Sequence, residues 1–190
     1  MDDELVEPTR HRLNVEDYHR MAHAGILTED DRVELIDGEL IDMSPIGSDH
    51  ATTVNGLTRA LVFAVGDRGI VSVQNPIRLD RHNEPQPDFV VWRPRKDNYR
   101  TLGTPGPQDA LLVVEVADSS LRFDRRTKLP MYAVFRIAEL WIVNLQDHVL
   151  EVHRDPVGDR FATVLQFREH DRVTLLMDPE IVVPLERIFD

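Results

Sequence analysis

The chain has 190 residues, no cysteine, 42% apolar residues and a formal net charge of −12 at pH 7. The length favours one well-buried domain, and the lack of cysteine excludes disulfides and thiolate metal sites, which leaves any metal to oxygen ligands and histidine. No long apolar run and no apolar leader behind a basic start marks a membrane span or a secretion signal, so we expect a cytoplasmic protein.

The N-terminal part is predicted to contain a flexible segment and a short helix. Residues 1–12 are polar and acidic, and we expect them to be flexible ahead of a single domain over residues 13–190. Asn14 can cap a helix from Val15 to about Ala24. Gly25 is the expected stop signal for this helix.

A β-hairpin and a long helix are predicted next. Residues 33–36 and 39–43 flank Asp37-Gly38, the pair that best supplies the two positive φ angles of a type I′ turn. From about Ser48 to Asp67, apolar residues recur every three or four positions, which indicates an amphipathic helix that packs on a sheet. Short strands are then expected at 70–74, 77–80 and 89–92, and a connecting loop rich in glycine and proline at 103–107.

The second half contains the most apolar strand. Residues 111–116 are apolar at nearly every position, as expected for a central strand covered on both faces. A helix is predicted from about Asp124 to Arg136, although Pro130 must remove one of its hydrogen bonds. The remaining elements complete a mixed sheet with helices, of the α/β or α+β class: strands at 139–143, 149–153 and 161–166, and a short closing helix at 185–189.

Two acids adjoin these apolar strands. Glu115 follows four apolar residues, and Asp88 follows Pro87 just before the strand at 89–92. An unpaired ionised group in an apolar setting is costly, so two such acids with Lys128 downstream suggest a metal site. For Glu115 a metal ligand is favoured over an ion-paired core acid, whereas Asp88 is equally well explained as a turn or strand-entry acid.

An ordered set of motifs carries a family resemblance. The motifs are Glu34-Leu35-Ile36-Asp37-Gly38-Glu39, His50, Pro87-Asp88, Glu115-Val116-Ala117-Asp118-Ser119-Ser120, Asp124 with Lys128 and Tyr132, and Glu139-Leu140-Trp141-Ile142-Val143. In this order and spacing, over roughly residues 15–190, the chain resembles the Uma family of bacterial proteins in the PD-(D/E)xK nuclease superfamily. The resemblance implies a restriction-endonuclease-like fold, in which helices flank a mixed sheet and the acids lie at one edge of the central strands.

The chain departs from the usual superfamily motif at one position. That motif has a lysine two residues after the strand acid, on the same face of the strand, and this position is Ala117 here. Within the Uma family the lysine has moved to the following helix, where Lys128 occupies its place. The resemblance therefore assigns the role of that lysine to Lys128.

By this resemblance, the chain is a metal-dependent endonuclease that hydrolyses phosphodiester bonds, with double-stranded DNA as the expected substrate and Mg²⁺ or Mn²⁺ as the cofactor. Asp88 and Glu115 would hold the metal through hard oxygen atoms, and Glu34 would complete the acidic cluster. Lys128 would stabilise the transition state. A homodimer is expected, because nucleases that cut both strands commonly pair two active sites by two-fold symmetry.

Two further residues are secondary candidates for this site. His50 could contact a metal or phosphate, but a capping or surface histidine is the simpler interpretation. Asp124 lies four residues before Lys128, and without the resemblance the two would be interpreted as a surface pair on a helix.

Two other functions remain open. The acidic composition and Ala117 favour a catalytically weakened binding or scaffolding module that keeps the nuclease fold. The negative charge would also suit a hydrolase of small phosphorylated substrates. Local basic clusters at 93–100 and 122–128 keep nucleic acid a reasonable partner, and salt dependence would separate these functions, because binding to a duplex weakens steeply as salt rises.

Overall fold

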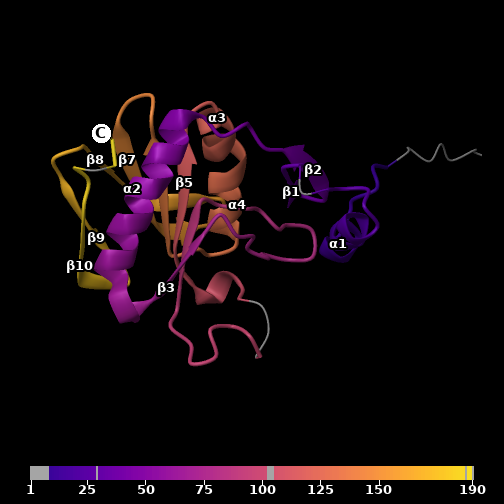
Figure 1. Cartoon of the computed structure of the whole chain (residues 1–190), viewed down its shortest axis with the longest axis horizontal. Helices are drawn as coiled ribbons and strands as arrows, with labels where there is room; N and C mark the ends of the chain where they lie inside the picture. Colours follow the sequence, from indigo (N-terminus) through magenta and orange to yellow (C-terminus); the bar gives the residue numbers. More distant parts are fainter. Residues whose placement is uncertain (1–8, 29, 102–104, 187, 190) are drawn as a thin grey trace, which may run out of the picture. The chain divides into compact units, whose positions relative to one another are not determined.

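The computed structural model describes residues 9–28, 30–101, 105–186 and 188–189 (Figure 1). The chain divides into two compact units, of which the first comprises Met1–Met43 with Leu79–Pro85 and the second Ser44–Arg78 with Gln86–Asp190. Most of the predicted flexible segment at 1–12, and part of the predicted loop at 103–107, lie outside the described residues. Within the described ranges, no helix has both the length and the apolarity needed to cross a bilayer.

The first unit contains a capped helix and a hairpin. Helix α1 (Val15–His23) begins with a capping box, in which the Asn14 side chain accepts from Asp17 N and the Asp17 carboxylate accepts from Asn14 N. Strands β1 (Val33–Ile36) and β2 (Glu39–Asp42) pair in antiparallel fashion. Asp37 and Gly38 have φ angles of 52° and 75°, the left-handed pair that a type I′ turn requires. The predictions of an N-terminal helix and hairpin are confirmed.

The second unit is built on a six-stranded mixed sheet in the order β3-β4-β5-β6-β7-β8. The strands are β3 (Ile70–Val73), β4 (Phe89–Trp92), β5 (Ala110–Ala117), β6 (Glu139–Asn144), β7 (Val149–Val157) and β8 (Arg160–Phe167). Only β5 and β6 are parallel within this sheet, and the helical segment between them supplies the crossover that a parallel pair needs. Strands β9 (Arg172–Leu175) and β10 (Asp178–Pro184) form a separate antiparallel ribbon.

Two predicted elements are wrong. Residues 77–80 form no strand, because Pro76 lacks an N–H for a ladder and the Asp80 carboxylate instead accepts from His82 N at 2.7 Å, which makes a turn. The described residues of the predicted closing helix at 185–189 form a turn as well, with Ile188 N donating to Leu185 O.

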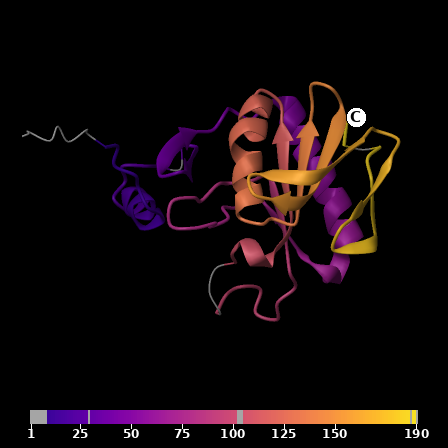
Figure 2. The same ribbon diagram turned by 180° about the vertical axis from the view of Figure 1, so that it is seen from behind.

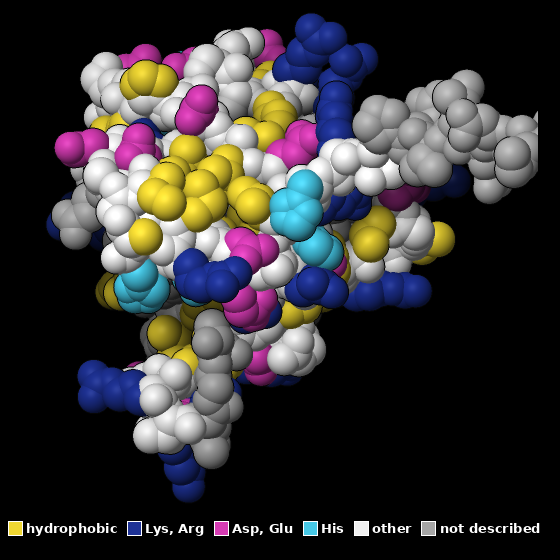
Figure 3. Space-filling model, turned by 90° about the vertical axis from the view of Figure 1, so that its right-hand side faces the viewer, with side chains coloured by type: hydrophobic (Ala, Val, Ile, Leu, Met, Phe, Trp, Pro, Cys, Tyr) yellow, Lys and Arg dark blue, Asp and Glu magenta, His cyan; other side chains and the backbone are white. Residues whose placement is uncertain are grey.

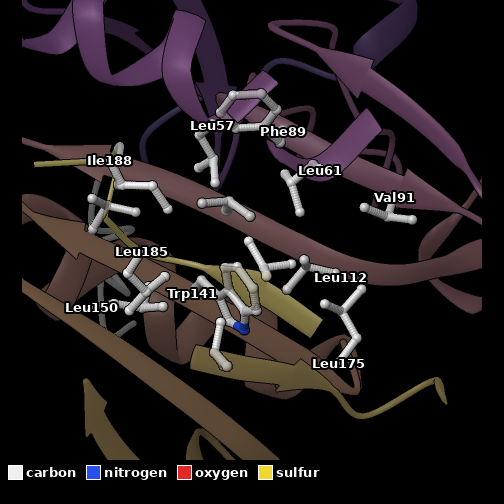
Figure 4. Close-up of a cluster of buried hydrophobic side chains, with 14 of the residues drawn as sticks. Leu57, Leu61, Phe89, Val91, Leu112, Trp141, Leu150, Leu175, Leu185 and Ile188 are labelled. Atoms are coloured by element: carbon white, nitrogen blue, oxygen red, sulfur yellow. The ribbon is translucent and has the colours of Figure 1, made fainter. Parts of the chain in front are cut away.

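Helix α2 (Ser48–Val65) covers one face of the six-stranded sheet. Its residues Leu57 and Leu61 point at Phe89, Val91 and Leu112 of the central strands (Figure 4). Residues of the β9–β10 ribbon join the same apolar cluster. Each fully buried side chain of this size contributes roughly 1.5–3 kcal/mol, so this cluster is the main source of stability in the second unit.

A second helical segment covers the opposite face, as the view from behind also indicates (Figure 2). It consists of α3 (Leu121–Phe123), a widened π-helical turn over Asp124–Lys128, and α4 (Leu129–Val134). The segment therefore begins three residues before the predicted start at Asp124. In the widened turn, Leu129 N donates to Asp124 O five residues back. Pro130 follows at once, and its missing N–H and bulky ring exclude the ordinary bond four residues back.

Candidate active site

The strand β5 presents Glu115 on the face opposite α2. Side chains alternate along a strand, and Val114 and Val116 belong to the apolar cluster beneath α2. Glu115 therefore faces the α3–α4 segment. The antiparallel register pairs Phe89 with Val114, and continuing it by one residue sets Asp88, which immediately precedes β4, opposite Glu115.

The carboxylate of Glu115 is held by two groups from the helical segment. Tyr132 OH donates to Glu115 Oε1 at 2.8 Å, and Lys128 Nζ lies 3.2 Å from the same oxygen. The side chains of Lys128 and Glu115 are only 5% and 6% exposed. Lys128 and Tyr132 are four residues apart, so they lie on one face of the helix. A lysine on the helix thus reaches the strand acid in the absence of a lysine at position 117.

Asp88 is held by groups from β5, from α2 and from Gln74, which follows β3. Its carboxylate accepts from Val116 N at 2.8 Å and from Gln74 Nε2 at 3.2 Å, and His50 Nε2 of α2 lies 3.2 Å away. Gln74 also donates its N–H to Asp88 O and has a φ of 50°, a left-handed conformation that is uncommon for a residue with a side chain. Asp88 is therefore a fixed, nearly buried acid at the entry to β4.

Of the two secondary candidates, Asp124 is buried and His50 is partly buried. Asp124 accepts from Ser120 Oγ at 2.7 Å and is buried, as is Lys128. The interpretation of Asp124 and Lys128 as a surface pair is thus wrong, because this face of the helical segment packs on the sheet. The sequence favoured a capping or surface histidine for His50. It lies in the first turn of α2, where a capping residue would be expected, but its side chain is only 16% exposed and contacts Asp88, so the surface alternative is wrong.

Glu34 belongs to the first unit, and Asp88, Glu115 and Lys128 belong to the second. It belongs to β1, where it pairs with Ile41, and it is only 3% exposed. Its burial agrees with a specific role rather than an outward position on the hairpin. Its place in the acidic cluster remains a prediction.

Sequence reasoning missed a second polar cluster on the same sheet face. The registers set Ile142 beside both Glu115 and Glu151, so the two acids lie two strands apart, about 10 Å at the usual strand spacing. Arg125 donates to Glu151, and His153 Nε2 lies 3.4 Å from it. The alternation Glu151-Val152-His153 was the signal that could have revealed this cluster, since both polar side chains share one face.

The electrostatics of Glu151 follow from these neighbours. Burial alone would raise the pKa of its carboxyl group, but His153 and Arg125 outweigh burial and lower the pKa to about 2. Glu151 is therefore ionised at neutral pH and balances the charge of Arg125. Because the two groups neutralise each other, this cluster stabilises the contact between β7 and the helical segment.

The acids could supply only part of the coordination shell of a metal ion. Among the described residues, no group of three or more histidine, aspartate or glutamate side chains is arranged to hold a metal ion. Mg²⁺, however, is commonly held by one or two carboxylates, with water and substrate phosphate completing its shell. Asp88 and Glu115 supply hard oxygen atoms of this kind. The residues fit a magnesium ion shared with substrate, not one caged by protein.

Basic side chains near these acids are mixed with acidic ones. Arg122 and Arg126 are exposed on the same helical segment as Lys128. On one face of the molecule, lysine and arginine side chains alternate with aspartate and glutamate and form no continuous basic surface (Figure 3). The net charge of −12 opposes polyanion binding in general, so any binding of phosphate would depend on local groups of cations.

The comparisons with known proteins agree with this architecture. A family model described as Uma2, "Putative restriction endonuclease", matches residues 15–186. A crystal structure of "a putative nuclease belonging to DUF820" from Anabaena variabilis matches with a TM-score of 0.72 and 12% identity, over 93% of this chain and 97% of that chain. At this identity the likeness shows the fold alone, and it confirms the expected mixed sheet flanked by helices. No curated protein matches the chain.

Proposed function

The chain belongs to the Uma2 family, described as putative restriction endonucleases, and from this membership we propose that it is a metal-dependent endonuclease acting on double-stranded DNA. Family membership and the nuclease named for the similar structure support nuclease function in general. The observation that carries the finer proposal is the buried contact of 3.2 Å between Lys128 Nζ and Glu115 Oε1. In phosphodiester hydrolysis, the acid of such a pair would hold the metal ion, and the lysine would stabilise negative charge that develops on the phosphate.

The acids would position the cofactor. Asp88 and Glu115 would hold Mg²⁺ or Mn²⁺, and the ion would lower the pKa of a water molecule and offset charge that develops on the phosphate. His50, Gln74 and the backbone of Val116 hold the Asp88 carboxylate in one orientation. This fixed orientation means that Asp88 would need little rearrangement when substrate arrives.

Lys128 would act on the phosphate directly. Its ammonium group carries a positive charge into a site with little exposure to water, where such a charge stabilises developing negative charge more strongly than in solvent. Tyr132 donates to Glu115 and thereby keeps the carboxylate beside Lys128. Glu34 is proposed as a further acid of the site, and a homodimer and a cytoplasmic location belong to the same proposal.

One alternative has a specific observation in its favour. A nuclease-fold module that binds without cleaving would retain Asp88 and Glu115 but not a complete metal site. Ala117 and the absence of a group of three metal ligands among the described residues agree with that function. The two functions differ in whether the bound nucleic acid is cut.

The experiment is a cleavage assay on supercoiled plasmid and on linear duplex, with Mg²⁺, with Mn²⁺ and with a chelator. We expect metal-dependent nicking or cutting by the wild type and a loss of at least about 100-fold in Asp88→Asn, Glu115→Gln and Lys128→Met, comparable with losing one transition-state stabiliser. Glu169→Gln, a change outside the site, is the matched control and should cut normally. Full cleavage by both Asp88→Asn and Glu115→Gln would refute the proposed site.

A further inference from the structure

A basic segment follows β4, and we call residues 93–101 the basic turn. It carries Arg93, Arg95, Lys96 and Arg100 against the single acid Asp97, in a chain whose net charge is −12. The segment begins the connection from β4 to β5 and projects from the end of the sheet (Figures 1 and 2). A local excess of cations in an acidic protein indicates an anionic partner at this place.

The Asp97 carboxylate organises the basic turn from within. Arg95 donates to it twice, through Nε at 2.8 Å and Nη2 at 2.9 Å. Thr101 donates through its backbone N at 3.1 Å and through Oγ1 at 2.9 Å. These bonds join Arg95 and Thr101 to one side chain, so the segment is held in shape before any partner binds.

The backbone of the basic turn adopts a conformation that needs such support. Arg100 N donates to Asp97 O at 3.0 Å, and the two residues between them, Asn98 and Tyr99, have φ angles of 46° and 61°. Left-handed backbone at a bulky residue is strained and persists only where neighbouring contacts impose it. Tyr99 has those contacts, since its OH donates to Arg93 O at 2.9 Å.

These internal contacts use one cation and leave three exposed. Arg95 is paired with Asp97, and its guanidinium lies 4.1 Å from the centre of the Tyr99 ring. The side chains of Arg93, Lys96 and Arg100 are exposed. Arg93 Nε donates to the backbone O of Gln108 at 3.4 Å, and none of the three forms an ion pair with a carboxylate of the described residues. The basic turn is thus a pre-organised support for three cations, which lowers the entropy lost when they bind an anion.

We propose that the basic turn binds the phosphate backbone of duplex DNA through Arg93, Lys96 and Arg100, an inference that rests on the proposed nuclease function. Strand β4 separates the turn from the site, because Asp88 precedes this strand and Arg93 follows it. Five residues of extended chain span about 16 Å, which corresponds to roughly five base-pair steps of 3.4 Å. One duplex can therefore meet both ends of β4. Contacts of this kind position the duplex without reading its sequence.

The test is the salt dependence of binding to a fluorescent 20-base-pair duplex, measured by anisotropy with a chelator present to prevent cleavage. The variant carries Arg93→Gln, Lys96→Gln and Arg100→Gln. Its matched control carries Arg160→Gln, Arg168→Gln and Arg172→Gln, three exposed arginines outside the basic turn. Both variants change the net charge by the same amount. Thermal unfolding should be unchanged in both, because all six side chains are exposed.

Each phosphate contact adds about 0.9 to the slope of log affinity against log salt. We therefore expect the slope of the basic-turn variant to fall by about 2.7, and its affinity at 0.1 M salt to fall by up to about 500-fold. The control should stay close to the wild type. If the triple variant unfolds, the single variants Lys96→Gln and Arg100→Gln should each lower the slope by about 0.9.

Three results would overturn the inference: a wild-type slope in the basic-turn variant, an equal loss in both triple variants, or no duplex binding by the wild type at low salt. The second would mean that net charge matters and the basic turn does not. The proposed nuclease function fails in a different way, when the wild type binds duplex through the basic turn but cuts nothing with either Mg²⁺ or Mn²⁺.

Discussion

Replacing Lys128 with methionine, alone and together with Glu115→Gln, should separate the contribution of the buried ion pair to stability from its contribution to cleavage. Lys128 and Glu115 are almost fully buried, and their charged atoms lie 3.2 Å apart. Removing the lysine leaves the Glu115 charge without its cation in an apolar setting, which costs about 3–5 kcal/mol. Tyr132 still donates to Glu115 Oε1, so we expect Lys128→Met to lower the free energy of unfolding by about 3 kcal/mol, the lower end of that range.

The double variant provides the decisive comparison. In Glu115→Gln with Lys128→Met, both charges are gone and the amide can still accept from Tyr132. Replacing a buried pair by neutral groups of similar volume is often close to neutral. We therefore expect the double variant to regain about 2 kcal/mol relative to Lys128→Met, so the losses of the two single variants should not add. Catalysis should not return, because neither the acid nor the cation is restored.

The assays are urea unfolding and thermal unfolding at pH 7 for the wild type, both single variants and the double variant, alongside plasmid cleavage. For a domain of this size, about 3 kcal/mol corresponds to a decrease in Tm of roughly 6–12 °C. Additive losses in the double variant, or a Tm for Lys128→Met within a degree of the wild type, would refute the buried ion pair. Recovery of cleavage in the double variant would refute the catalytic role.

Three further predictions follow from the described contacts. The pKa of Glu151 is lowered to about 2 from 4.5, so the stability that this carboxylate contributes is fully present above pH 4.5 and is lost as pH falls toward 2. The difference in unfolding free energy between the wild type and Glu151→Gln should therefore shrink between pH 6 and pH 3. A difference that stays constant over this range would contradict the prediction. Leu61→Ala should cost about 2–5 kcal/mol in chemical unfolding, whereas Phe63→Ala, at a side chain that is 91% exposed, should stay within about 0.5 kcal/mol. His50→Ala should lower metal affinity, measured by calorimetry, about 10- to 100-fold, because it frees the Asp88 carboxylate to rotate; unchanged affinity would show that the histidine has no positioning role.

Much of the fold could be predicted from the sequence because the responsible signals are local. Asp37-Gly38 meets the stereochemical demand of its turn, and the predicted hairpin follows from that pair alone. The apolar spacing between Ser48 and Val65 identifies both the helix and the side that it buries. The strand at 77–80 failed for an equally local reason, since turn bonds to the Asp80 carboxylate outweighed its apolar residues.

The candidate site was predictable in its residue types but not in its pairings. Charged residues beside apolar strands are costly unless they are paired, so Asp88, Glu115 and Lys128 could be predicted as site residues from the sequence. Which atoms meet depends on distant parts of the chain, as Glu151 illustrates. Its partner Arg125 lies 26 residues away, and no spacing rule connects the two.

The sequence by itself therefore determined the mixed sheet, the hairpin and the acids in the apolar strands, because side-chain alternation and turn chemistry act over a few residues. Only the tertiary structure decided that Lys128 meets Glu115. That contact depends on the crossover between the parallel strands β5 and β6 and on the widened turn before Pro130. An extra residue in a helical turn shifts the following side chains by about 100° around the axis, so the face on which Lys128 and Tyr132 lie is set by packing against the sheet.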